Sequence, residues 1–122
     1  LRRSSAASDV YKRQQKDEKL IPELDKNKTK DDLVQCFLQK EPARKLKNLS
    51  KTNILILTGQ SSYHAPYDHG TSNFLKQAGV EHDFIRLEDH NIKGNGHMMM
   101  HEKNSKEIST FINNWIEKNY SI

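Results

Sequence analysis

The most regular pattern of apolar positions lies near the C-terminal end of the chain. Large apolar side chains recur there at the i, i+3, i+4, i+7, i+8 spacing of one helix face. They are Ile108, Phe111, Ile112, Trp115 and Ile116. Asn104, followed three residues later by Glu107, fits a capping box at a helix start. We therefore expect an amphipathic helix beginning after Asn104, with Trp115 in the core.

Two shorter apolar runs predict β-strands. Residues 53–59 form an apolar run that ends at a glycine, which is typical of a strand buried on both faces. Residues 82–87 predict a second strand. Between the two runs, Thr71 or Ser72 is expected to cap a helix, and Gly79 is expected to end it.

The N-terminal part gives weaker signals. Residues 15–30 are rich in Lys, Asp, Glu and Asn, which predicts a polar loop with a tendency to disorder. Apolar positions at helical spacing then predict a helix that begins at Asp31 or Asp32 and runs through Gln39. Pro42 is expected to open a second short helix, because the first position of a helix does not need its N–H.

Strands that alternate with helices predict an α/β fold with a parallel sheet. Two strands alone do not make a stable sheet with both faces covered. The apolar character of the first strand therefore calls for neighbouring strands that this chain does not contain. We expect the chain to be a fragment of one larger domain, with residues 31–122 belonging to that incomplete domain.

Composition changes the interpretation of the N-terminal residues and, through them, of the net charge. Residues 4–14 read as a sequencing-library adapter translated in frame, so residues 1–14 are interpreted as an artefactual leader. The whole chain has a formal net charge of +4. Without the leader, 16 Lys and Arg remain against 15 Asp and Glu, a net charge of +1. The basicity therefore gives no support for a nucleic-acid partner.

Cysteine content and hydropathy exclude further classes. Cys36 is the single cysteine, which excludes an internal disulfide framework and a cysteine-based zinc site, and slightly favours a cytoplasmic location. No apolar run reaches the roughly 20 residues of a membrane-spanning helix.

Candidate chemistry gathers in the loops that follow the two predicted strands, where open parallel sheets collect functional groups. The first loop contains Ser61, Ser62, Tyr63, His64, Tyr67, Asp68 and His69. The second contains Glu88, Asp89, His90, Gly94, Asn95, Gly96 and His97. The two glycines that flank Asn95 would let the backbone turn tightly and bring His97 to a defined place.

Several stretches carry a resemblance to a known fold family. They are EPAR at 41–44, LTGQSSYHAPYDH at 57–69, QAGV at 77–80, GNGHMMM at 94–100 and EKN at 102–104. On these residues the chain resembles the C-terminal part of α/β-hydrolase-fold proteins. The resemblance implies that residues 54–58 and 83–87 form the last two strands of the parallel sheet, with flanking helices.

The resemblance also implies catalytic roles. In that family a nucleophile, an acid and a histidine follow each other along the chain. His97 matches the histidine, which takes a proton from a serine-type nucleophile and returns it to the leaving group. Asp68 is the candidate acid, although Ser61 and Ser62 occupy the positions where the acid is commonest. Capping of the following helix is the alternative role for Asp68, and some members carry the acid one strand earlier.

The nucleophile is not in this sequence, because no Gly-x-Ser-x-Gly motif occurs. We expect a serine-type, esterase-like hydrolase in full-length form, with the missing N-terminal part of the same domain as partner. This chain alone should be inactive. The substrate would be a small ester or related acyl compound. The alternatives are a non-catalytic α/β-hydrolase-fold binding protein and a flavodoxin-like binding module.

No metal or cofactor is expected. His97 and His101 stand four residues apart, but no His-Glu-x-x-His motif or thiolate partner accompanies them. The methionines at 98–100 are expected to pack beneath the active site.

Overall fold

The computed structural model describes residues 21–27 and 30–120. The predicted leader at 1–14, and the parts of the predicted polar loop at 15–20 and 28–29, lie outside the described residues. The elements are β1 (Pro22–Leu24), β2 (Phe37–Gln39), η1 (Leu49–Lys51), β3 (Leu55–Thr58), α2 (Asp68–Gln77), β4 (Asp83–Arg86), η2 (Leu87–His90), η3 (Met99–His101) and α3 (Ser105–Asn119). The described chain is therefore mixed α/β.

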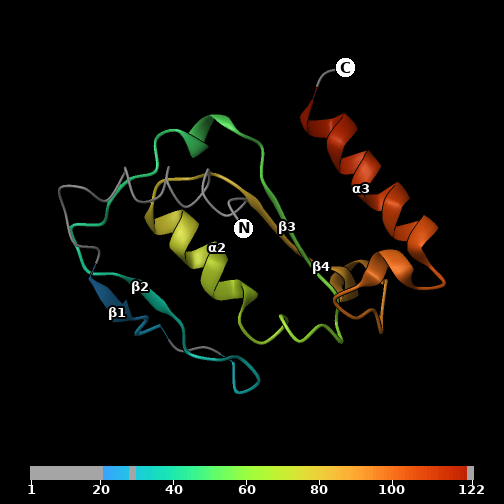
Figure 1. Ribbon diagram of the computed structural model, residues 1–122, viewed down its shortest axis with the longest axis horizontal. Helices are drawn as coiled ribbons and strands as arrows, with labels where there is room; N and C mark the ends of the chain where they lie inside the picture. The colour runs from blue at the N-terminus through green and yellow to red at the C-terminus, as the bar shows by residue number, and fades with distance from the viewer. Residues whose placement is uncertain (1–20, 28–29, 121–122) are drawn as a thin grey trace, which may run out of the picture.

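The centre of the fold is a β-α-β unit formed by β3, α2 and β4 (Figure 1). β3 and β4 pair in parallel, with Leu55 opposite Asp83 and Thr58 opposite Arg86. Both strands and their parallel pairing were predicted from the apolar runs. Helix α2 ends as predicted, because Gly79 follows it with φ of 75°, a left-handed conformation that glycine adopts without steric cost.

The start of α2 differs from the prediction. The helix begins at Asp68, three residues before Thr71, and neither Thr71 nor Ser72 caps it. Backbone N–H groups of Tyr67 and Asp68 both donate to the carbonyl of His64 at 3.0 Å, so the preceding turns lead directly into the helix. Asp68 consequently stands in the first turn of α2, where the helix dipole favours a negative charge.

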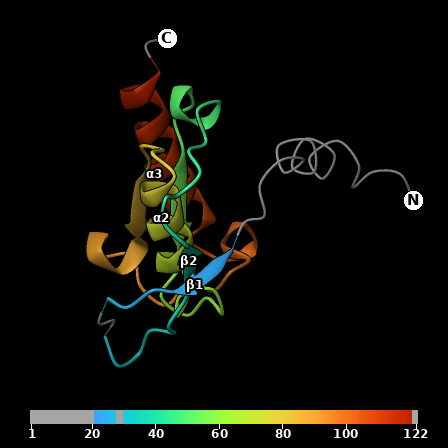
Figure 2. The ribbon, with the colours of Figure 1, turned by 90° about the vertical axis from the view of Figure 1, so that its left-hand side faces the viewer.

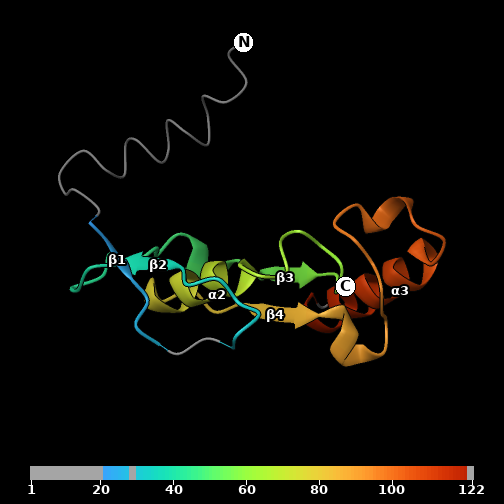
Figure 3. The same cartoon turned by 90° about the horizontal axis from the view of Figure 1, so that it is seen from below.

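Helices α2 and α3 lie on opposite sides of the β3–β4 pair, which Figures 1 and 3 show from two directions. In Figure 2, α3 lies behind α2. Leu87, Ile92 and Ile108 form the buried core cluster. Of the predicted apolar stripe of α3, only Ile108 is buried, and the prediction that Trp115 lies in the core is wrong. Trp115 is half-buried, and its indole N–H donates to Asp83 at 2.6 Å.

The first helix predicted from the sequence is replaced by β-structure. β1 and β2 pair antiparallel, with Pro22 opposite Gln39 and Leu24 opposite Phe37. The prediction of a polar loop at 15–30 is also wrong in part, because Pro22–Leu24 form strand β1. The N–H of Val34 donates to the carbonyl of Pro66 at 2.8 Å, so this segment uses distant backbone partners in place of those a helix would supply.

The second helix, predicted to open at Pro42, is also absent from the described chain. The side chain of Gln39 accepts a hydrogen bond from the Arg44 N–H and donates one to the Arg44 carbonyl, both at 3.0 Å. These contacts occupy backbone groups that a helix would use, and residues 43–46 have no regular secondary structure. A short turn of 3-10 helix follows only at Leu49–Lys51.

The burial of β3 is lower than predicted. Leu55, Ile56 and Leu57 are half-buried, and only Thr58 is fully buried. In the described chain β3 pairs with β4 alone, so its other edge has no strand beside it. None of the described helices has the length and apolar character needed to cross a membrane.

Candidate functional site

The loops that follow β3 and β4 meet at one end of the strand pair. At Gly59 the two loops approach so closely that an added Cβ atom would lie 2.4 Å from the backbone oxygen of Asn95. The N–H of Ser61 donates to the same oxygen at 2.9 Å. The structure therefore brings together the two loops in which the sequence predicts the chemistry.

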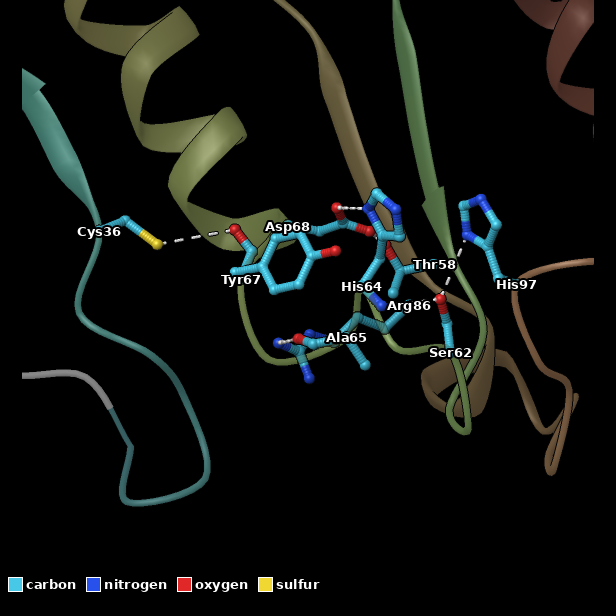
Figure 4. Close-up of polar contacts among 9 residues, drawn as sticks. All are labelled: Cys36, Thr58, Ser62, His64, Ala65, Tyr67, Asp68, Arg86 and His97. Carbon is cyan, nitrogen blue, oxygen red and sulfur yellow. Dashed lines mark hydrogen bonds and ion pairs between the residues drawn. The ribbon is translucent and has the colours of Figure 1, made fainter.

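His97 lies on the exposed surface at the end of the second loop, facing residues of the first. Its Nδ1 is 3.4 Å from the hydroxyl oxygen of Ser62, a contact marked by a dashed line in Figure 4. Its ring stacks on that of His64, with centroids 4.3 Å apart and planes inclined by 11°. The ring of Tyr63 lies 4.7 Å away at a tilt. His97 is therefore held by three neighbouring residues of the β3 loop.

The Ser62 hydroxyl can accept a hydrogen bond from Nδ1 of His97 or donate one to it, depending on the tautomer of the ring. A proton on Nδ1 would be donated to Ser62, which leaves the Nε2 lone pair as the acceptor. The Ser62 oxygen also accepts the backbone N–H of His64 at 3.1 Å, which fixes its position. Among the described residues, Nε2 of His97 has no hydrogen-bond partner. This nitrogen is thus free to act as a base toward an incoming group.

Asp68 is bound by two side chains other than His97. Its carboxylate accepts the hydroxyl of Thr58 at 2.6 Å and pairs with Nδ1 of His64 at 3.1 Å. The Asp68 side chain is only 14% exposed. In the described structure Asp68 therefore reaches His97 only through the stacked ring of His64. Its carboxylate does not act as the N-cap of α2, since the N-cap position is Tyr67.

Ser62 and His64 are thus site residues to which the sequence assigned no role. A signal for His64 was present, because His64 and Asp68 stand four residues apart, the spacing of neighbours on a helical turn. No comparable signal pointed to Ser62. Its contact with His97 joins residues from two loops and depends on how those loops dock.

Tyr67 and Arg86 border the same cluster. Burial raises the pKa of the Tyr67 hydroxyl, and nearby Tyr63 and Asp68 raise it further, so the phenol stays protonated. The guanidinium of Arg86 donates to the carbonyl of Ala65 at 3.3 Å and pairs with Glu88 at 3.7 Å. Arg86 thereby links the end of β4 to the loop that follows β3.

A second histidine contact lies at the start of α2. The thiol of Cys36 is 3.8 Å from Nε2 of His69. Burial raises the pKa of this thiol, with a smaller contribution from Asp25. Since the thiolate is the reactive form, the raised pKa works against Cys36 as a nucleophile.

Among residues 21–27 and 30–120, no group of three or more His, Cys, Asp or Glu side chains is arranged to hold an ion. The methionines beside His97 differ from the prediction. Met99 packs against the core cluster, whereas Met98 and Met100 are 55% and 59% exposed.

Comparison with known proteins finds a similar curated protein. The chain is 44% identical over 99 residues to a protein named "Probable secreted lipase" from a fungal species (strain ATCC 74256). The match covers 81% of this chain and 26% of the relative, so the chain spans about a quarter of the relative's length. No family model matches the chain, and no solved structure matches it. The similarity to a lipase agrees with the hydrolase resemblance in the sequence.

Proposed function

We propose that this chain is the C-terminal part of a serine-type, esterase-like hydrolase of the α/β-hydrolase fold and supplies the histidine of its catalytic triad. The observation that carries the proposal is the placement of His97. The ring is exposed at the end of a parallel strand pair, with Nδ1 facing Ser62 and Nε2 unpaired among the described residues. The resemblance of the GNGH run and the similarity to a named lipase support the same function.

In the proposed reaction, Nε2 of His97 takes the proton of a serine hydroxyl as its oxygen attacks the ester carbonyl carbon. The proton then passes from Nε2 to the departing alcohol oxygen as the C–O bond breaks. A water molecule repeats the sequence on the acyl-enzyme, and its proton returns to the serine. The serine lies outside this chain, since the sequence contains no Gly-x-Ser-x-Gly motif.

Asp68 has a supporting role in this proposal. When His97 carries a second proton, the positive charge stacks against the His64 ring at 4.3 Å. His64 is in turn bound to the Asp68 carboxylate, so a negative charge stands behind the ring pair. Asp68 therefore stabilises the imidazolium through His64, while Ser62 contacts Nδ1 of His97.

The surroundings of His97 favour an apolar acyl or alkyl group in the substrate. Tyr63 is 66% exposed and its ring contacts that of His97. Met98, which directly follows His97 in the chain, is 55% exposed. Small-molecule sites are lined mostly by apolar and aromatic side chains, with a few polar groups that fix the orientation of the ligand. An ester or related acyl compound fits this surface and agrees with the name of the curated relative.

The proposal is tested by expressing the protein from its uninterrupted reading frame and measuring hydrolysis of p-nitrophenyl esters. The full-length protein should hydrolyse these esters, while this chain alone, as the matched control, should not. A serine-reactive phosphonate should label the full-length protein. A full-length protein without a Gly-x-Ser-x-Gly motif, or without turnover and labelling, would favour the non-catalytic binding protein.

Asp68→Asn in the full-length protein tests the role of Asp68 as the acid that supports His97 through His64. The amide keeps the size of the carboxylate but removes the charge behind His64. We expect kcat to fall at least about 10-fold, but by less than the roughly 10⁴-fold seen when a directly bonded triad acid is neutralised. Steady-state kinetics measures the change, with exposed Asp89→Asn as the matched control. Full activity in Asp68→Asn would limit Asp68 to a structural role at the start of α2.

A further inference from the structure

The two residues before His97 are fixed by a cluster of polar side chains that no catalytic role explains. Asn95 is only 3% exposed. Its amide nitrogen donates to Glu102 and, at 2.7 Å, to the side-chain oxygen of Asn104. The Asn104 amide returns a hydrogen bond to Asn95 at 3.0 Å. We call Asn95, Glu102 and Asn104 the polar clamp.

Glu102 also binds the backbone next to the histidine. One of its carboxylate oxygens accepts the Gly96 N–H at 2.9 Å, while the other accepts the Asn95 amide. Gly96 directly precedes His97, so the carboxylate fixes the peptide unit from which the imidazole projects. Each carboxylate oxygen thus binds a different donor, and hydrogen bonds to an ionised group are stronger than neutral ones.

The same loop, residues 94–97, also makes hydrogen bonds to the loop that follows β3. Ser61 donates its N–H to the Asn95 carbonyl at 2.9 Å, and the Gln60 side chain accepts the Gly94 N–H at 3.0 Å. The histidine loop is therefore held between the end of β3 on one side and the start of α3 on the other. His97 itself is exposed, so these contacts fix the backbone from which its ring projects toward Ser62 and His64.

We infer that Glu102 and Asn95 are positioning residues that hold His97 in register with Ser62 and His64. This inference rests on the proposed function for its catalytic consequence, but the placement of the ring can be measured separately. Because neither residue touches the reacting atoms, the clamp should act on kcat and leave KM unchanged. Misplacement of a catalytic group by about 1 Å can lower the rate by about 100-fold.

The donor and acceptor pattern of the clamp gives a sharp test. In Glu102→Gln, the new amide must point its N–H₂ at the Asn95 amide or at the Gly96 N–H, so one contact is lost. In Asn95→Asp, the new carboxylate faces that of Glu102. In the double variant, the amide introduced at position 102 can donate to the carboxylate introduced at position 95. Glu102→Gln should therefore lower kcat in the native background and raise it in the Asn95→Asp background, a sign reversal that reports direct coupling.

The experiment uses the full-length protein and two readouts. Steady-state hydrolysis of a p-nitrophenyl ester should show kcat about 10- to 100-fold lower in Glu102→Gln, with KM unchanged. The ring ¹H–¹³C signals of His97 and His64 should shift as their stacking is lost. Glu107→Gln, the same substitution at an exposed position of the first turn of α3, should leave both readouts unchanged.

The outcomes separate this inference from the proposed function. Shifted ring signals in a protein without hydrolase activity would keep the clamp and remove the hydrolase. Unshifted ring signals in Glu102→Gln, or the same sign of effect in both backgrounds, would overturn the clamp even if the enzyme is active. If Asn95→Asp fails to fold, the comparison of Glu102→Gln with Glu107→Gln still decides the question.

Discussion

Replacing His97 by alanine in the full-length protein is expected to lower kcat for ester hydrolysis by at least about 10⁴-fold, because a serine nucleophile would lose its only proton acceptor. The loss of stability should be small. His97 is exposed, and its side-chain contacts are the rings of His64 and Tyr63 and a hydrogen bond of 3.4 Å to Ser62. Steady-state kinetics and circular dichroism on the same sample measure the two effects.

His101→Ala is the matched control for this substitution. His101 stands four residues after His97 and is exposed. Its backbone N–H donates to the carbonyl of Met98 at 2.9 Å, and among the described residues its side chain has no hydrogen-bond partner. We expect activity close to that of the native protein. Retained turnover in His97→Ala would remove His97 from the mechanism, and equal losses in both variants would point to damage of the loop as a whole.

Gly59→Ala is the second substitution with a large expected effect. The added methyl group would lie 2.4 Å from the carbonyl oxygen of Asn95 and 2.9 Å from that of Gly96. Both are backbone atoms that cannot rotate away, so the histidine loop must move off the end of β3. We expect a destabilisation of about 1–3 kcal/mol and a loss of ester hydrolysis. Thermal unfolding and steady-state kinetics of the full-length variant measure these changes.

Gly94→Ala separates the steric effect from the cost of removing a glycine. Its new methyl group would meet no atom within 4 Å, but the backbone there has φ of 82°. The left-handed conformation costs a residue with a side chain about 1–2 kcal/mol. Activity should therefore fall much less than in Gly59→Ala. Similar kinetics for the two variants would show that the contact at Gly59 does not place the histidine.

The parts of the fold that sequence predicted correctly depend on local patterns. Residues 53–59 and 82–87 predicted β3 and β4, since an unbroken apolar run needs no knowledge of distant partners. The helical spacing near the C-terminus predicted α3 in the same way. Its capping box did not form, because the side chain of Asn104 binds Asn95 and leaves the helix N-terminus without a side-chain cap.

The parts that sequence predicted wrongly depend on contacts between distant residues. Phe37 and Leu38 fit a helical spacing, yet they form β2 because β1 pairs with them. Pro42 was compatible with a helix start, but the Gln39 side chain binds the backbone of Arg44. Neither partner can be inferred from a periodicity. Short three-residue strands such as β1 and β2 carry almost no pattern of their own.

In the candidate site, too, the sequence predicted the features that follow from local patterns and missed those that depend on distant contacts. The meeting of the two loops followed from the rule that the ends of parallel strands share one edge. His97 was named from its place in one of these loops and from the family resemblance. The pairing of Asp68 with His64 and Thr58, and of His97 with Ser62, depends on side-chain directions that only the structure supplies.

The contacts that orient His97 all come from between Thr58 and Asn104, a continuous stretch of the chain. Under the proposed function, the contacts that orient the proton acceptor are then local to one segment, whereas the serine comes from another part of the protein. Selection could reshape the walls that recognise the acyl group without disturbing the base.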